Sequence, residues 1–161
     1  IVHAWIPDLR FHIIGTNPPK EICEQACEYI VIEGFIENMD EQLASRRLSV
    51  APLRYGSGVK GKINQSMAYG LPCVATPSAV EGMELDWQNE ILVAESAHDF
   101  AEAIAELYEN EEYWTLVAEK SMESIERSFS PRVAEDGIRK MLEYHGRECL
   151  GPDPARATGS K

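Results

Sequence analysis

The stretch from Leu48 to Thr76 decides the fold, because it combines two short apolar runs with a glycine-rich loop and a helix. It begins with Leu48-Ser-Val-Ala-Pro-Leu53 and continues through Arg54-Tyr-Gly-Ser-Gly-Val-Lys-Gly61. A helical stretch then ends at Gly70, and Pro72-Cys-Val-Ala-Thr76 supplies the second apolar run. Two strands connected through a helix are parallel in nearly all folds. The stretch therefore predicts one strand–helix–strand unit of a parallel sheet.

The same alternation continues on both sides of this stretch. Further strands are expected at Leu9–Gly15, Tyr29–Phe35 and Ile91–Ala94, and short helices at Lys20–Glu28 and Glu41–Arg47. Apolar strands that alternate with helices favour a parallel sheet covered by helices on both faces. The expected fold class is therefore α/β, a Rossmann-like parallel sheet between layers of helices.

The last third of the chain is helical. Ser96 followed by Asp99 resembles a capping box, and apolar residues then recur at helical spacing through Ile125. Ser130-Pro131 restarts a helix that we expect to stop at Gly146. We predict one domain over residues 1–150, truncated at its N-terminus, and a flexible polar tail over residues 151–161.

Composition narrows the class of protein. The chain has 161 residues, 44% of them hydrophobic, and no apolar run near the ~18–20 residues of a membrane span. It begins with neither Met nor a signal peptide, so we expect it to belong to a longer protein. The cysteines follow no disulfide or zinc pattern, which favours reduced thiols and a cytoplasmic location. If the full-length protein binds a membrane, we expect this domain at the inner face of that membrane. Cys23 and Cys27 are expected to form a buried pair one helical turn apart.

Charge is unevenly distributed in this acidic chain, whose formal net charge is −12. No Asp or Glu occurs from residue 42 to residue 80, and we call this segment the acid-free island. Its basic residues are Arg46, Arg47, Arg54, Lys60 and Lys62. The island indicates either a local anion site or a buried sheet region with few acids. The acidic remainder disfavours nucleic acid as a partner.

The glycine-rich loop is the candidate site. Its glycines let a ligand approach the backbone, and the following helix directs its free N–H groups and positive dipole end to the same place. Gly56 to Gly61 also fits the dinucleotide pattern G-x-G-x-x-G, but Thr76-Pro77 stands where the ribose-binding acid belongs. A P-loop is excluded too, because Ile63 occupies the position of the magnesium-binding Ser or Thr.

Six short motifs follow one another between residues 9 and 130. They are Ile14-Gly15, Glu33-Gly-Phe-Ile36, Val50-Ala-Pro-Leu-Arg54, Gly58-Val-Lys-Gly-Lys62, Met67-Ala-Tyr-Gly-Leu-Pro-Cys-Val-Ala-Thr76 and Glu81-Gly-Met83. In this order and spacing they resemble the C-terminal, donor-binding domain of group 1 (family 4) glycosyltransferases of the GT-B fold. The match is with the branch that contains exopolysaccharide sugar transferases.

The resemblance implies a retaining transfer of sugar from a nucleotide-diphosphate donor, without a bound metal or other cofactor. The sequence contains no Asp-x-Asp, the metal-holding motif of the other large glycosyltransferase fold. The diphosphate and donor sugar would then lie against Arg54, Gly56, Ser57, Gly58, Val59, Lys60 and Lys62. Gly34 and Phe35 would lie beside the base, Gln65 would hold the ribose, and Glu81 and Gly82 are further donor contacts.

Five of these residues also have a purely structural alternative. Lys60 and Lys62 are then solvated lysines at the start of a helix. Arg54 pairs with Glu81, which otherwise shapes its loop, and Phe35 lies in the core. The residue types alone leave these alternatives open.

Two departures from the family pattern bear on activity. Ser57 and Gln65 stand where the family has the two Glu residues of its Glu-seven residues-Glu motif. A Gln still hydrogen-bonds a ribose, but without charge assistance. The leading hypothesis is the donor-binding domain of an enzyme whose acceptor-binding N-terminal domain is missing here. The alternatives are a catalytically degenerate nucleotide-binding module and a fragment of a GT-B sugar-nucleotide epimerase.

The resemblance also implies that one strand of the sheet is missing. That strand would lie at the sheet centre, between the strands at residues 9–15 and 48–53. We expect that these two strands either close up directly or leave a gap filled by a second copy or by protein outside this chain. A monomer with both edges bare to solvent would count against this strand order.

Overall fold

The computed structural model describes residues 1–56, 58 and 60–149, with side chains as far as Tyr144. The expectations for Ser57, for Val59 and for the tail at 151–161 lie outside the described residues. Contacts divide the chain into a unit from Ile1 to Ser124 and a second unit from Ile125 onward.

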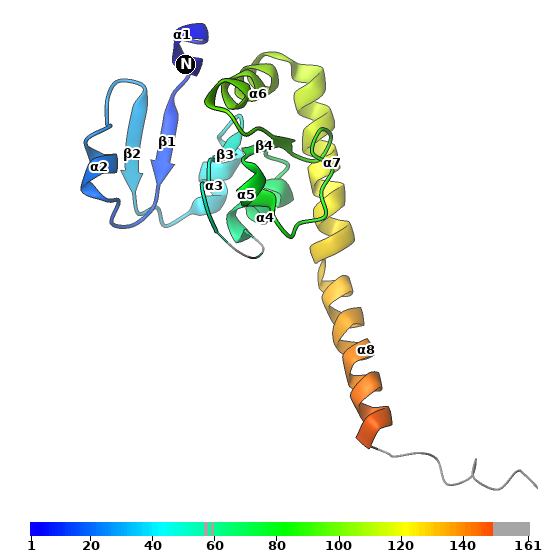
Figure 1. The fold of residues 1–161 in the computed structure, drawn as a ribbon. Coiled ribbons are helices and arrows are strands. Elements are labelled where there is room, and N and C mark those ends of the chain that lie inside the picture. Colours follow the sequence, from blue (N-terminus) through cyan, green and yellow to red (C-terminus); the bar gives the residue numbers. More distant parts are fainter. Residues whose placement is uncertain (57, 59, 150–161) are drawn as a thin grey trace, which may run out of the picture. The chain divides into compact units, whose positions relative to one another are not determined.

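Parallel strands form two small sheets in the first unit (Figure 1). β1 (Phe11–Ile14) pairs in parallel with β2 (Ile30–Gly34). The other sheet has the order β3-β4-β5, in which β3 is Ser49–Ala51, β4 is Cys73–Ala75 and β5 is Leu92–Val93. Both of its pairings are parallel, with Val50 opposite Val74 and Val74 opposite Leu92. The parallel α/β class predicted from the sequence is confirmed.

Helices connect and follow the strands. They are α1 (Val2–Trp5), α2 (Lys20–Cys23), α3 (Met39–Ala44), α4 (Gly61–Ala68), α5 (Pro77–Val80), α6 (Ala97–Glu109), α7 (Glu111–Phe129) and α8 (Pro131–Cys149). Helix α6 begins at the predicted cap, where the Ser96 hydroxyl accepts a hydrogen bond from the Asp99 backbone N–H at 3.1 Å. The helical C-terminal segment is also present as predicted.

The core of the first unit lies around the second sheet. Val74 and Leu92 of the sheet are buried together with Leu107 of α6 and Val117 of α7. Helix α4 turns Ile63 and Met67 inward, and both are almost fully buried. This packing fixes the carboxyl end of β3 and the first turn of α4, and the glycine-rich loop connects those two points.

The expected helix at Lys20–Glu28 was wrong in its extent. α2 ends at Cys23, because Cys27 forms an antiparallel bridge with Ile30 that turns the chain into β2. Cys23 and Cys27 are therefore both exposed and do not form a buried pair on one helix. The expected end of α8 at Gly146 was also wrong, since the helix continues to Cys149. A glycine inside a helix costs only about 1 kcal/mol, so it does not by itself end one.

Helical cover on both faces holds for one sheet only. β4 is wholly buried, but the residues of β1 and β2 are half-buried or exposed. Phe11 at the start of β1 is 38% exposed. The strands β1 and β2 are thus apolar in sequence, but the described part of the chain does not cover both of their faces completely.

The two sheets do not join. Within the described ranges β1 pairs with β2 alone, and β3 pairs with β4 alone. The first alternative, in which β1 and β3 close up directly, is therefore wrong. In the described residues both of these edges are unpaired, and the alternatives that remain are a gap filled by a second copy or by protein outside this chain.

Candidate functional site

The candidate site lies where β3 ends and α4 begins. The Thr76 hydroxyl, just after β4, donates a hydrogen bond of 2.5 Å to the Leu53 carbonyl, just after β3. This contact ties the carboxyl ends of two parallel strands together beside the glycine-rich loop. Ligands of open parallel α/β sheets bind at this end of the strands. The sequence analysis names Thr76 only as the end of a strand and does not predict this contact. The feature that could have predicted it is a hydroxyl side chain directly after a buried strand.

Glycine is required at two loop positions. Gly58 has φ +74° and Gly56 has φ +151°, values that other residues rarely adopt. A Cβ added at Gly56 would also lie 3.3 Å from the Lys60 Cε atom. The loop therefore holds the Lys60 side chain close against the backbone of Gly56, where a larger residue would collide with it.

Lys60 is the residue that starts α4. It has an extended conformation, and its Nζ donates a hydrogen bond of 2.7 Å to the Gly58 carbonyl. No side chain caps α4 among the described residues, and no acid occurs in its first turn. Lys62 follows in that first turn and is exposed. A lysine ammonium and the first free N–H groups of an eight-residue helix thus face the same loop, an arrangement suited to an anion.

The basic residues of the acid-free island form two groups: those held by contacts within the protein and those without an ion pair in the described residues. Arg46 is bound by Glu33, with 3.3 Å between a guanidinium nitrogen and Oε1, and it also donates to Gln42. The Arg47 guanidinium lies 4.8 Å from the centre of the Trp114 ring. Arg54 is exposed and has no ion pair among the described residues, so its alternative pairing with Glu81 does not form. Arg54, Lys60 and Lys62 therefore remain for a ligand.

The candidate base and ribose contacts are all accessible. Phe35 is 74% exposed directly after β2, so its alternative position in the core is wrong. Gly34 has φ +70° at the end of that strand, and Gln65 is exposed on α4. Glu81 and Gly82 are exposed after α5. No hydrogen bond or ion pair among the described residues connects these residues to the loop, so the structure brings together only its own members, Gly56, Gly58 and Lys60.

One polar cluster was missed from the sequence. The His12 Nδ1 atom lies 2.6 Å from Glu33 Oε1, the same oxygen that Arg46 approaches. The cluster connects β1, β2 and the end of α3, because the imidazole of His12 and the guanidinium of Arg46 approach the same carboxylate oxygen. The only sequence signal was a lone histidine within an apolar strand.

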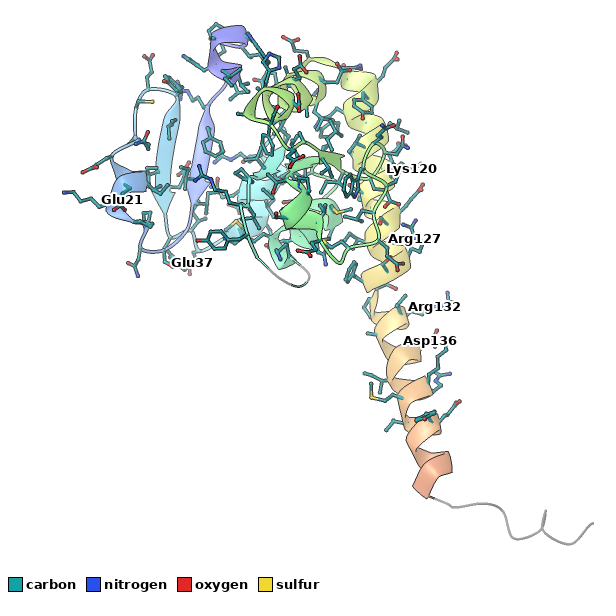
Figure 2. The ribbon with its side chains drawn as sticks, viewed as in Figure 1. Glu21, Glu37, Lys120, Arg127, Arg132 and Asp136 are labelled. Atoms are coloured by element: carbon teal, nitrogen blue, oxygen red, sulfur yellow. The ribbon has the colours of Figure 1, made fainter. Side chains whose placement is uncertain are left out.

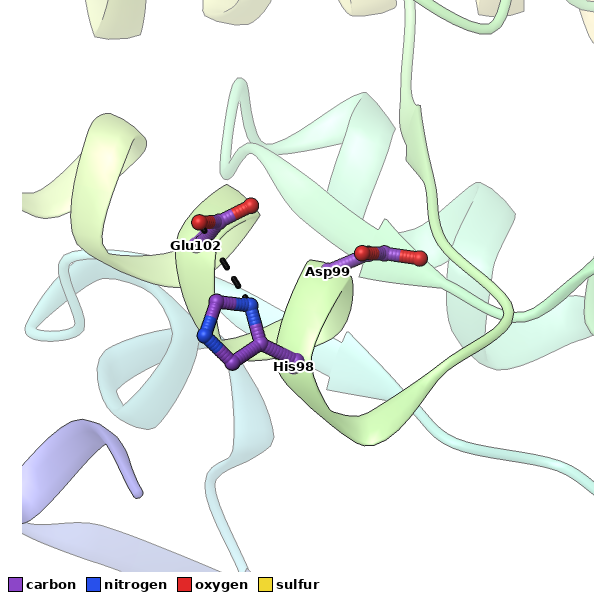
Figure 3. Close-up of side chains that lie close together, drawn as sticks. All are labelled: His98, Asp99 and Glu102. Atoms are coloured by element: carbon purple, nitrogen blue, oxygen red, sulfur yellow. Dashed lines mark ion pairs between the residues drawn. The ribbon is translucent and has the colours of Figure 1, made fainter.

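A second cluster, on α6, consists of His98, Asp99 and Glu102 (Figure 3). His98 Nδ1 lies 3.4 Å from Glu102 in an i,i+4 pair, and all three side chains are exposed. Asp99 also stands in the first turn of the helix, where an acid stabilises the dipole. The cluster is accounted for by helix electrostatics and carries no role at the loop.

Acidic side chains cover much of the surface of the first unit. Glu21 and Glu37 project outward from it (Figure 2), and both are exposed. Against this background the three free cations of the loop stand out as the place where an anion is attracted rather than repelled. In the described part of the chain, no helix has both the length and the apolar character needed to cross a membrane.

A glycine-rich loop at the carboxyl ends of parallel strands is typical of domains that bind phosphate groups or nucleotides. The chain belongs to the group 1 glycosyltransferases, because the family model described as glycosyl transferases group 1 matches residues 1–110. Among curated proteins, none matches the chain.

Solved structures of GT-B glycosyltransferases share its fold. A variant of S. aureus TarM, in complex with fondaparinux, alpha-GlcNAc-glycerol and UDP, is 20% identical with a TM-score of 0.72 over 86% of this chain and 30% of that chain. The pneumococcal O-GlcNAc transferase GtfA, in complex with UDP and GlcNAc, is 19% identical with a TM-score of 0.69 over 88% of this chain and 31% of that chain. Anabaena HepE, in complex with UDP-glucose, is 14% identical with a TM-score of 0.75 over 86% and 42%. This chain thus spans less than half the length of each.

Proposed function

We propose that this chain is the nucleotide-sugar-binding domain of a retaining, metal-independent glycosyltransferase of polysaccharide or glycoconjugate synthesis. The observation that carries the proposal is the family match over residues 1–110, which includes the β3–loop–α4 unit with its free cations. Three structures that share the fold are complexes with UDP or UDP-glucose, and this supports a nucleoside-diphosphate donor.

The loop would hold the diphosphate. Lys60 and Lys62 supply positive charge, Arg54 is free to add more, and the first N–H groups of α4 supply hydrogen bonds. The charge that develops on the departing diphosphate is met in this way by fixed cations and amides, without a metal ion. Lys60 would exchange its present hydrogen bond to the Gly58 carbonyl for one to a phosphate oxygen.

The remaining contacts follow from exposure and position. Phe35 presents an exposed ring beside the base and follows Gly34 at the end of β2, while the Gln65 amide reaches ribose hydroxyls from α4. Ser57 and Val59 belong to the same loop by sequence. Glu81 and Gly82 would touch the donor sugar from the end of α5. The proposal includes a cytoplasmic location, which the unpaired cysteines favour.

A second candidate is a domain that binds nucleotide but has lost catalysis. It is favoured by one specific observation, the replacement of both motif carboxylates by Ser57 and Gln65. A fragment of a sugar-nucleotide epimerase is the further alternative. All three share the nucleotide site, so a binding experiment tests what they have in common.

Calorimetric titration of the chain with UDP and GDP at low salt tests the site. We expect weak binding that is better than millimolar for at least one of the two. Lys62→Ala should weaken it by about 1–2 kcal/mol, the value of one charge-assisted contact.

Lys20→Ala is the matched control, because Lys20 is an exposed lysine on α2 whose contact is an ion pair with Glu24. It removes the same charge far along the sequence from the loop and should leave the affinity unchanged. Absence of binding by either nucleotide, or equal losses for the two variants, would contradict the proposed site.

A further inference from the structure

Thr76 stands at the junction between β4 and α5. It is the residue before α5, at the N-cap position, with φ −83° and ψ 159°. A threonine at this position ordinarily accepts a hydrogen bond from a backbone N–H of the first helical turn, and that bond stabilises the helix. Among the described residues, the Thr76 hydroxyl makes no such bond. The side chain is therefore used for something other than helix capping.

The Thr76 hydroxyl is directed to the neighbouring strand instead. It donates a hydrogen bond of 2.5 Å to the Leu53 carbonyl and lies 3.5 Å from the Ala51 carbonyl. The Thr76 backbone N–H donates to the same Ala51 carbonyl at 3.2 Å. One residue thus contacts the chain on both sides of Pro52, at the point where the chain leaves β3.

The segment that leaves β3 has few other contacts to hold it. Every residue from 52 to 56 is exposed, so packing holds this segment only weakly. In the part of the chain that the structure describes, the segment makes two hydrogen bonds. The Leu53 N–H donates to the Ala51 carbonyl at 2.9 Å, which closes a tight turn within the segment's own stretch of chain. The other is the bond from Thr76, and it is the one that ties the segment to another element.

The two ends of the glycine-rich loop are therefore anchored differently. At the far end, α4 is fixed by side chains that are almost fully buried. At the near end, Arg54 follows directly on the Leu53 carbonyl that Thr76 holds. Gly56, against which the Lys60 side chain lies, comes two residues after Arg54. Loss of the Thr76 hydroxyl would free the near end alone.

We propose that Thr76 is a positioning residue for the glycine-rich loop. Its hydroxyl holds the Leu53 carbonyl, and through it Arg54 and Gly56, in the arrangement that receives the diphosphate of a nucleotide-sugar donor. This role in binding rests on the proposed function, whereas the hold on the loop needs no ligand. Because the hydroxyl makes the contact, serine should replace threonine at this position and valine should not.

Three variants separate this role from a general effect on stability. Thr76→Val removes the hydroxyl and keeps the shape, whereas Thr76→Ser keeps the hydroxyl. Neither removes a helix cap, and water replaces the lost hydroxyl at Leu53, which is 37% exposed, so we expect both variants to fold. Thr76→Ala takes the place of Thr76→Val if urea denaturation shows the valine variant to be unfolded. Ser96→Ala is the matched control, because it removes a hydroxyl that caps α6 and has no contact with the loop in the described residues.

Trypsin measures the hold on the loop without a ligand. Cleavage needs local opening of the chain after a basic residue, here after the exposed Arg54, and the exposed Lys20 on α2 is the internal reference. We expect Thr76→Val to raise the ratio of cleavage at Arg54 to cleavage at Lys20 by about threefold or more. Thr76→Ser and Ser96→Ala should leave that ratio unchanged. The same ratio in the original chain and in Thr76→Val would overturn the proposal.

Calorimetric titration with UDP tests the consequence for binding. We expect Thr76→Val to bind UDP about fivefold more weakly than the original chain, and Thr76→Ser and Ser96→Ala to keep the original affinity. Unchanged affinity of Thr76→Val, when the original chain binds UDP, overturns the proposal and leaves the proposed function intact. Absence of binding by the original chain contradicts the proposed function instead, and the trypsin ratio then decides whether Thr76 holds the loop.

Discussion

Cys73 in β4 is the buried thiol among the described residues. It is 1% exposed, and burial raises its pKa to about 11, an effect that the nearby Ser49 hydroxyl partly offsets. Because the thiolate is the reactive form, we expect iodoacetamide at pH 8 to alkylate the exposed Cys23 and Cys27 but not Cys73 in the folded chain. Peptide mass spectrometry after short labelling measures each site. Labelling of Cys73 at the rate of Cys23, without denaturant, would contradict the buried position.

Gly70 ends α4 in a conformation that favours glycine. Its φ is +63°, and a Cβ added there would lie 3.1 Å from the Met122 sulfur. We therefore expect Gly70→Ala to lower the free energy of unfolding by about 1–2 kcal/mol, through left-handed strain and crowding. Urea denaturation provides the measurement. Gly15→Ala is the control, because nothing lies within 4 Å of its added Cβ. Equal stability of the two variants would count against this account.

Elements with local signals were predictable from the sequence. The loop between β3 and α4 follows from its glycines, and α6 begins at its Ser96 cap. The end of α2 was not predicted, because the turn that follows it, closed by the bridge between Cys27 and Ile30, contains no glycine or proline to mark it. In the same way, the sequence marked five basic residues as one island. Arg46 and Arg47 differ from the other three basic residues because they contact Glu33 and Trp114, and the sequence alone does not show these contacts.

The turn from Asp86 to Asn89 precedes β5 and depends on one carboxylate. Asp86 accepts from the Asn89 side chain at 2.8 Å and from the Gln88 backbone N–H at 3.0 Å. These hydrogen bonds, the Asn89 side chain first, hold its pKa below the ordinary 3.8. A pKa lowered by folding means that the carboxylate stabilises the fold above pH 3.8, and that this contribution is lost as pH falls through the lower folded-state pKa.

Asp86→Asn isolates this contribution, because it keeps the shape and removes the charge. We expect the variant to be less stable than the original at pH 7 and pH 5, and the difference to shrink toward zero below pH 3.8. Urea denaturation of both proteins at each pH gives the difference. A difference that stays constant down to pH 3 would show that the charge of Asp86 is not what stabilises the turn.

Taken as a whole, the molecule resembles less than half of a glycosyltransferase chain. It covers 30% of TarM, 31% of GtfA and 42% of HepE. Its glycine-rich loop lies within residues 1–110, which match the family model. Binding a donor and transferring its sugar are separable tasks, because transfer also requires an acceptor held in line with the reacting carbon. We expect such positioning to need polypeptide beyond residues 1–161.

The last prediction is therefore that residues 1–161 bind nucleotide but transfer no sugar. Holding two reactants in the reactive geometry is worth about 7–11 kcal/mol of the barrier, and the chain spans less than half the length of the glycosyltransferases that share its fold. The test incubates the purified chain with UDP-glucose or GDP-mannose, with and without simple sugar acceptors, and measures released diphosphate. We expect only slow hydrolysis, at the same rate with and without acceptor. The full-length protein is the positive control. Acceptor-dependent release by the chain alone would show that these residues contain the complete catalytic site.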